Sequence, residues 1–125
     1  MILVVEDDET MRHVLQVFLE DKGYVVLAAR DGLEGLKIYR NRASEIRLVL
    51  SDVMMPKLNG IEMWLQLKAI DSNVDVVFGT GFLDGPTRQR LTDLGITKIL
   101  QKPYLPKEVL EAIREIVGDP PSSFG

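Results

Sequence analysis

The chain has 125 residues and a mass of 14.1 kDa, which is the size of one ordinary domain with a single core. Hydrophobic residues make up 46% of it and charged residues 27%, and this composition excludes a disordered or fibrous protein. The formal net charge of −4 excludes a strongly basic surface, so we expect no direct contact with nucleic acid.

Residue types that are missing or rare narrow the chemistry further. The longest apolar run, Met1 to Val5, is far shorter than the ~20 residues that span a bilayer, so we expect no membrane insertion and a cytoplasmic location. Cysteine is absent and His13 is the single histidine, which removes disulfides, thiolate metal sites and multi-histidine metal sites. Oxygen ligands from carboxylates and hydroxyls remain.

Short apolar runs alternate with helical patterns along the whole chain, which is typical of a parallel sheet built from successive strand and helix units. The runs predict five strands, at Ile2 to Val5, Tyr24 to Ala28, Leu48 to Ser51, Val74 to Phe78 and Lys98 to Gln101. The periodic segments predict five helices, at about Thr10 to Asp21, Gly32 to Asn41, Asn59 to Ile70, Pro86 to Leu94 and Pro106 to Val117.

Local signals support these helices. Pro86 and Pro106 fit the first turn of a helix, and Gly23, Gly95 and Gly118 follow the ends of three of them. The first helix is expected to bury a stripe made by Met11, Val14, Leu15, Phe18 and Leu19. The second is expected to bury Leu33, Leu36 and Ile38, and it contains Gly35, which weakens a helix by ~1 kcal/mol relative to Ala.

The predicted fold is therefore an α/β, doubly wound, five-stranded parallel sheet of the flavodoxin-like type, with strand order 2-1-3-4-5. Residues 1–118 are expected to form this domain. Residues 119–125 have the composition of a linker.

Polar residues follow the predicted strands at one edge of this sheet. Glu6 and Asp7 follow the first strand, Asp52 the third, Thr80 the fourth and Lys102 the fifth. Ligands of open α/β sheets bind beyond the carboxyl ends of the strands, and the first and third strands are neighbours where the winding reverses. The three acids should therefore lie close together.

Three neighbouring carboxylates repel one another and need cations. Lys102 supplies one charge, and a divalent ion with oxygen ligands, Mg²⁺ above all, supplies two. A metal, a lysine and a hydroxyl around a carboxylate indicate phosphoryl transfer, in which Asp52 is the candidate nucleophile.

These residues resemble the receiver domain of two-component response regulators, and the likeness covers residues 1 to 118. It is carried by Ile2-Leu3-Val4-Val5-Glu6-Asp7, by Ser51-Asp52-Val53-Met54-Met55-Pro56 with Asn59-Gly60, by Gly79-Thr80-Gly81, and by Lys102-Pro103. Each piece alone is weak, but the four in this order and spacing are highly specific.

The resemblance implies a role for each site residue. Glu6, Asp7 and Asp52 would hold Mg²⁺ together with the backbone carbonyl of Met54, and Asp52 would accept the phosphoryl group. Thr80 and Lys102 would contact that group, and the Lys102-Pro103 bond would be cis. The donor would be a sensor histidine kinase or a histidine phosphotransfer protein. Such a domain is no enzyme in the usual sense, because it catalyses only its own phosphorylation and dephosphorylation.

The chain departs from the family pattern at three positions. Ile99 stands three residues before Lys102, where the family often has an aromatic switch residue, so an aromatic flip cannot report phosphorylation here. Phe82 and Met54 are bulky apolar residues that flank the path of attacking water, and we expect them to alter the lifetime of the phosphoryl group.

Other functions remain open. A receiver-like module that only docks to partners and never carries phosphate has the same fold. A phosphatase of the haloacid dehalogenase type is approximated by Glu6-Asp7-Asp8-Glu9-Thr10, but Glu6 stands where the nucleophilic Asp belongs. A flavodoxin lacks support because no Ser/Thr/Gly-rich phosphate loop follows the first strand. Because the chain begins at its first strand and ends in a linker-like tail, we expect it to be a piece of a longer protein, either a hybrid kinase or a regulator without its output domain.

Overall fold

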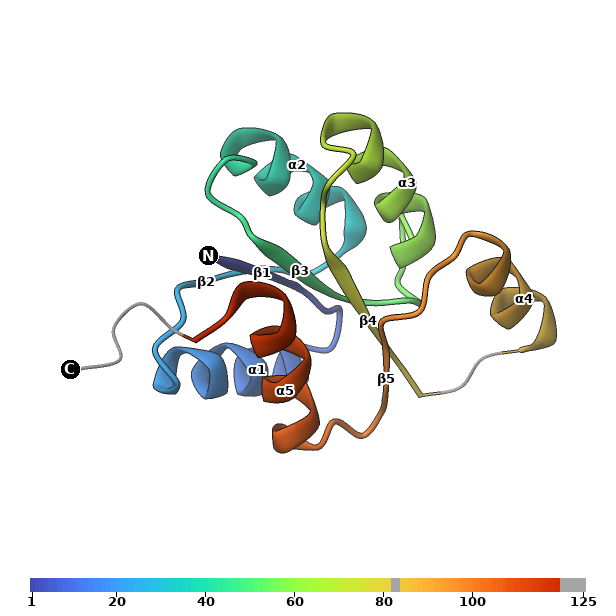
Figure 1. Ribbon diagram of the computed structural model, residues 1–125. Helices are drawn as coiled ribbons and strands as arrows, with labels where there is room; N and C mark the ends of the chain where they lie inside the picture. The colour runs from blue at the N-terminus through green and yellow to red at the C-terminus, as the bar shows by residue number, and fades with distance from the viewer. Residues whose placement is uncertain (82–83, 120–125) are drawn as a thin grey trace.

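The computed structural model describes residues 1–81 and 84–119, in which strands and helices alternate (Figure 1). The strands are β1 (Ile2–Val5), β2 (Val26–Ala29), β3 (Leu48–Asp52), β4 (Val76–Thr80) and β5 (Ile99–Gln101). The helices are α1 (Glu9–Asp21), α2 (Gly32–Arg42), α3 (Gly60–Ile70), α4 (Gly85–Asp93) and α5 (Pro106–Val117).

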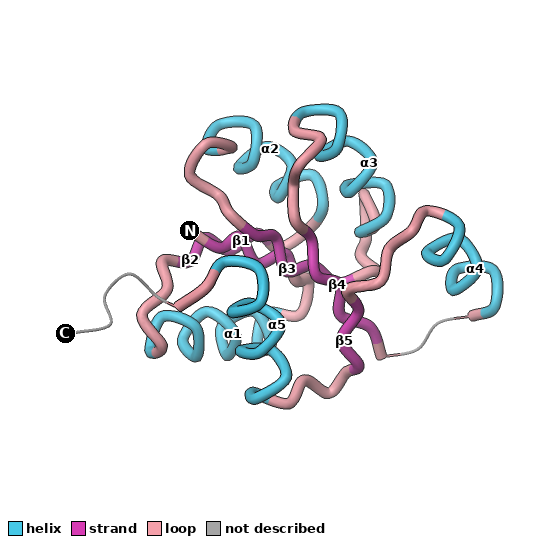
Figure 2. Tube along the Cα trace, viewed as in Figure 1, coloured by secondary structure: helices cyan, strands magenta, loops and turns pink. Residues whose placement is uncertain are grey.

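The strands form one parallel sheet in the order β2-β1-β3-β4-β5, as the sequence predicts (Figure 2). β1 pairs with both β2 and β3, so Val5 lies between Ala29 and Ser51. Asp52 pairs with Gly79 on β4, and Thr80 pairs with Gln101 on β5. The register therefore brings the carboxyl ends of β1, β3, β4 and β5 to the same edge.

Helices cover both faces of the sheet, with α1 and α5 on one side and α2 and α3 on the other (Figure 1). Alternate strand residues point into two separate cores, because successive side chains of a strand face opposite ways. One core packs α2, α3 and α4 against residues such as Leu3, Val49 and Phe78. The other packs α1 and α5 against residues such as Val4 and Leu50. This burial on both faces explains the unbroken apolar strands β1 and β3.

Two strands begin two residues later than the sequence predicts, and β5 begins one residue later, at Ile99. The backbone N–H of Tyr24 donates to Leu19 at the end of α1, so Tyr24 belongs to the helix end and β2 starts at Val26. The N–H of Val74 donates to Asp71 in the turn after α3, so β4 starts at Val76 and extends to Thr80. Helix ends agree within a residue, and Gly23, Gly95 and Gly118 have the positive φ angles expected after helices.

The predicted apolar stripes contain two errors. The side chain of Val14 is 53% exposed, because it lies ~100° around α1 from Leu15, which faces the sheet. Leu33 is 52% exposed because it lies away from the buried face of α2, and that face includes Gly35. A Cβ at Gly35 would lie 2.9 Å from a methyl carbon of Val5, so glycine permits the close approach of α2 to β1.

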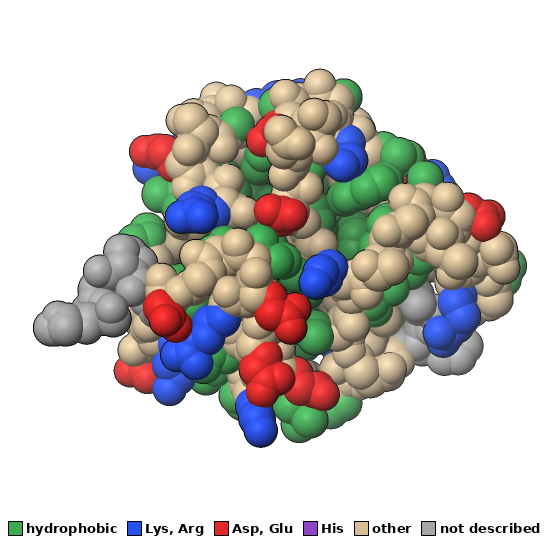
Figure 3. Space-filling model, viewed as in Figure 1, with side chains coloured by type: hydrophobic (Ala, Val, Ile, Leu, Met, Phe, Trp, Pro, Cys, Tyr) green, Lys and Arg blue, Asp and Glu red, His purple; other side chains and the backbone are tan. Residues whose placement is uncertain are grey.

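The remaining surface has two further features. Trp64 is half-buried on α3 against the first core, and the Lys68 ammonium nitrogen lies 5.5 Å from its ring centroid. Acidic and basic side chains are interspersed over the face that carries α1 and α5 (Figure 3). Among the described residues, no helix is both long and apolar enough to cross a bilayer.

Candidate functional site

The predicted site residues meet where four strands end. Glu6 directly follows β1, Asp52 and Thr80 are the last residues of β3 and β4, and Lys102 directly follows β5. The β-ladder continues for one residue past β1, because the N–H of Glu6 donates to the carbonyl of Ala29. Glu6 is 1% exposed, Asp52 9% and Thr80 5%, so three polar side chains are buried at this edge.

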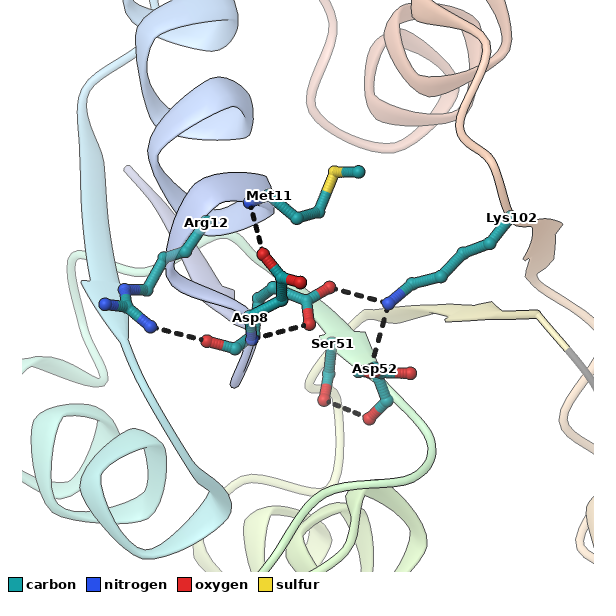
Figure 4. A network of polar contacts seen from close by, with 7 residues as sticks. Asp8, Met11, Arg12, Ser51, Asp52 and Lys102 are labelled. Carbon is teal, nitrogen blue, oxygen red and sulfur yellow. Dashed lines mark hydrogen bonds and ion pairs between the residues drawn. The ribbon is translucent and has the colours of Figure 1, made fainter.

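Lys102 links the two buried acids. Its Nζ lies 2.8 Å from Oε1 of Glu6 and 3.0 Å from Oδ2 of Asp52. Figure 4 shows the long Lys102 side chain extending from the end of β5 across to Asp52. The backbone N–H of Lys102 donates to the carbonyl of Thr80, so the strand pairing fixes the base of this side chain. Asp52 and Glu6 precede Lys102 by 50 and 96 positions in the chain, and direct ion pairs join both of them to the lysine.

Burial and charge act in opposite directions on these groups. Burial raises the pKa of Glu6, and the hydrogen bond from Lys102 reduces that rise. Burial acts to lower the pKa of Lys102, but the hydrogen bonds with Glu6 and Asp52 outweigh it, so the net shift is upward. The lysine therefore stays charged at neutral pH.

A third carboxylate completes a possible metal site. Carboxylate oxygens of Glu6, Asp7 and Asp52 all lie within 4.8 Å of one another, and Asp7 is exposed while the other two are buried. Three carboxylates next to one ammonium group leave a local deficit of positive charge, and all the donors are oxygens. This donor set fits Mg²⁺, which binds a few carboxylates and keeps several waters.

The first turn of α1 holds Glu6 in place. Its second carboxylate oxygen accepts a hydrogen bond from the N–H of Asp8, and its carbonyl accepts one from the guanidinium of Arg12 (Figure 4). The Asp8 side chain caps α1 by accepting from the N–H of Met11, as expected for an acid at a helix start. His13, further along this helix, is exposed. Arg12 is a contact that sequence reasoning missed, because only the helical turn brings it back to Glu6.

The loop after β3 carries the fourth predicted metal-site residue, Met54, whose side chain is 57% exposed. The N–H of Val53 donates to the carbonyl of Gly79, and the N–H of Gly60 donates to the carbonyl of Val53. These bonds fix the loop on both sides of Met54. Phe82, predicted to flank the path of water, lies outside the described residues.

Two predictions about the end of β5 can be compared with the structure. The Lys102-Pro103 peptide bond is cis, as expected. Ile99 is the first residue of β5 and its side chain is 36% exposed, so an aliphatic group occupies the position of the aromatic switch. Tyr104 is a neighbour of Lys102 that the sequence did not single out, and its ring centroid lies 5.7 Å from the lysine Nζ.

Curated relatives match most of the chain. It is 38% identical over 115 residues to the uncharacterized transcriptional regulatory protein YkoG of Bacillus subtilis, covering 90% of this chain and 49% of that protein. It is 34% identical over 116 residues to the probable transcriptional regulator ycf27 of Porphyridium aerugineum, covering 93% of this chain and 47% of that protein. The chain thus spans about half the length of the curated relatives it matches.

Solved structures give the same assignment. A response regulator receiver domain protein from Clostridium thermocellum superposes with a TM-score of 0.86 at 30% identity, covering 93% of this chain and 92% of that one. Residues 2–114 also match the family described as the response regulator receiver domain. The strand order and the position of the site at the four strand ends agree with these similarities. The chain belongs to the receiver domain family of two-component response regulators.

Proposed function

We propose that this domain accepts a phosphoryl group on Asp52 from a phosphohistidine of a sensor histidine kinase or histidine phosphotransfer protein, and later hydrolyses it. One observation carries the proposal: the Lys102 ammonium contacts Glu6 and Asp52 at once, beside the third carboxylate of Asp7. A buried nucleophile, a fixed cation and a divalent metal site are the parts that phosphoryl transfer needs.

Each residue has a role in the transfer. A carboxylate oxygen of Asp52 attacks phosphorus, the bond between phosphorus and the imidazole nitrogen breaks, and the nitrogen keeps the electron pair. Lys102 compensates negative charge on the phosphoryl oxygens, and the Thr80 hydroxyl donates a hydrogen bond to one of them. Glu6, Asp7, Asp52 and the carbonyl of Met54 would hold Mg²⁺, which supplies positive charge to the same oxygens when bound. Hydrolysis of the aspartyl phosphate restores the carboxylate and releases inorganic phosphate.

Phosphorylation would act on partners by a shift between two conformations. The added charge on Asp52 attracts the Thr80 hydroxyl and the Lys102 ammonium, and both residues sit at the ends of strands on the β4 and β5 side. Two curated relatives are named as transcriptional regulators and are about twice as long. We therefore propose that in a full-length protein this surface controls an attached output domain.

The experiment is incubation with Mg²⁺ and acetyl phosphate, followed by the mass of the intact protein. We expect the addition of one phosphoryl group, its loss in Asp52→Asn, and its loss when EDTA replaces Mg²⁺. Asp8→Asn is the matched control, because Asp8 is a nearby exposed carboxylate and asparagine also caps helices.

Three results would contradict the proposal. Absence of labelling in the wild-type chain would leave the phosphate-independent docking module as the better function. Labelling that persists in Asp52→Asn would place the phosphoryl group on another residue. Continuous turnover of a phosphate ester would favour the phosphatase of the haloacid dehalogenase type.

A further inference from the structure

Tyr104 occupies a space that Gly79 leaves open on the sheet. Its side chain extends from the segment between β5 and α5 and packs with the core formed by α1 and α5. A Cβ built on Gly79 would lie 1.6 Å from the Tyr104 hydroxyl oxygen and 2.3 Å from the ring carbon that bears it. The phenol thus sits where any other side chain at position 79 would begin.

This fit joins two places that are 25 positions apart in the chain (104 − 79). Gly79 pairs with Asp52 in the sheet and immediately precedes Thr80. Tyr104 follows Lys102 by two residues. The Tyr104 side chain therefore connects the segment after Lys102 with β4, which carries Thr80 and pairs with Asp52 on β3.

The Tyr104 ring also lies beside the Lys102 ammonium group, with 5.7 Å between Nζ and the ring centroid. A cation at this distance is attracted to the electron-rich face of an aromatic ring. Lysine is a long and flexible side chain, and its ammonium must stay between Glu6 and Asp52 to act on a phosphoryl group. A fixed ring beside it restricts the positions that the ammonium can adopt.

We propose that Tyr104 is a positioning residue that holds Lys102 in its working place, and that Gly79 is there to admit the Tyr104 ring. The inference rests on the proposed function, since Lys102 must contact a phosphoryl group for its position to affect a rate. The ring carries this role and the hydroxyl does not, because the attraction to the ammonium comes from the ring face.

The first test measures the rate of phosphorylation by acetyl phosphate in the presence of Mg²⁺. Tyr104→Leu, which removes the ring, should slow labelling by about three- to tenfold. Tyr104→Phe, which keeps the ring, should stay within about twofold of wild type. Gly79→Ala should slow labelling like Tyr104→Leu because it displaces the ring. Gly85→Ala is the matched control, because a Cβ at Gly85 would meet nothing within 4 Å.

The second test separates positioning of Lys102 from general support of the fold. In a Lys102→Met background, Tyr104→Leu should cause no further loss of rate, because its effect passes through the lysine. A merely structural role predicts the same fold loss in both backgrounds and would overturn the inference. Circular dichroism melting confirms that each variant is folded, and Gly79→Ala provides the second variant if Tyr104→Leu is not.

The outcomes are distinguishable from failure of the proposed function. A wild-type chain that takes up no phosphoryl group refutes the proposed function and the inference with it. A wild-type chain that is labelled at the same rate as Tyr104→Leu overturns the inference alone. A Phe variant as slow as the Leu variant also overturns it, because the ring would then not be the active part.

Discussion

Replacing Lys102 with methionine removes the positive charge between two buried acids and keeps a side chain of similar length. In the wild-type protein this charge is 2.8 Å from Glu6 and 3.0 Å from Asp52, and the side chains of these acids are 1% and 11% exposed. Removing one partner of a buried ion pair costs ~3–5 kcal/mol. Since the lysine side chain is 22% exposed and Glu6 can take up a proton, we expect a loss of ~2–3 kcal/mol at pH 7 without Mg²⁺.

The loss should depend on pH in a defined direction. Burial already raises the pKa of Glu6, and without the Lys102 hydrogen bond that pKa rises further. A carboxyl group with a raised pKa binds its proton more tightly in the folded state than in the unfolded state. Its favourable contribution is full below the ordinary glutamate pKa and is lost as pH rises through the folded pKa. The deficit of Lys102→Met should therefore be largest at pH 8 and shrink towards pH 5.

Urea unfolding of both proteins at pH 5, 6, 7 and 8 in EDTA measures this deficit. Added Mg²⁺ should reduce it, because an ion bound by these carboxylates would stabilise the folded state and replace part of the missing charge. Lys98→Met is the matched control. Its ammonium lies 3.4 Å from Glu115 in an exposed pair, so its effect should be within about 0.5 kcal/mol at every pH. A deficit for Lys102→Met that is constant across this pH range, or that grows as pH falls, would refute the reasoning.

Two further predictions concern packing. Gly60→Ala should destabilise the fold by ~2–4 kcal/mol in urea unfolding, because its Cβ would lie 2.3 Å from the carbonyl oxygen of the last residue of β3. Gly85→Ala is the control and should be neutral or stabilising, because its Cβ would meet nothing within 4 Å. Equal effects of the two alanines would contradict this. Ile113→Ala should lower the free energy of unfolding by ~2–5 kcal/mol, because it empties a fully buried position. Val14→Ala, at an exposed position, should change it by less than about 0.5 kcal/mol. A large loss of stability in Val14→Ala would mean that α1 packs differently.

The alternation of strands and helices could be read from the sequence because each element carries its own period and its own end signals. β1 and β3 are short apolar runs buried on both faces, and α5 begins at Pro106 and ends before Gly118. These signals are local, so they can be recognised without knowledge of the tertiary structure. Strand order followed from the winding rule for such units.

The errors arise where packing decides between similar residues. Val14 and Leu15 are adjacent and both apolar, yet only Leu15 faces the sheet, since the direction of the helix axis selects one of them. Gly35 weakens a helix by composition, but the close approach of α2 to β1 requires it. The type of a residue, taken alone, does not show whether its side chain faces the core or whether a glycine is needed for close packing.

The site was more predictable than its surroundings. Glu6, Asp52 and Lys102 could be placed together because each stands at or directly after the carboxyl end of a strand, and parallel strands end at one edge. The fit of Tyr104 onto Gly79 has no such signal, because it depends on side-chain direction across two segments. Contacts of this kind connect the candidate site residues to the rest of the domain, so we expect that substitutions outside the motif residues can alter the site.

Met54 is a motif residue whose side chain lies at the surface of the site. Its side chain is 57% exposed and stands two residues after Asp52, so a polar replacement should change the stability of the fold by less than about 0.5 kcal/mol. An apolar side chain there should limit the approach of water to an aspartyl phosphate. Met54→Asn should therefore change the rate of label loss, measured by mass after removal of acetyl phosphate, by about two- to tenfold. An unchanged rate in Met54→Asn would mean that water reaches phosphorylated Asp52 by another path.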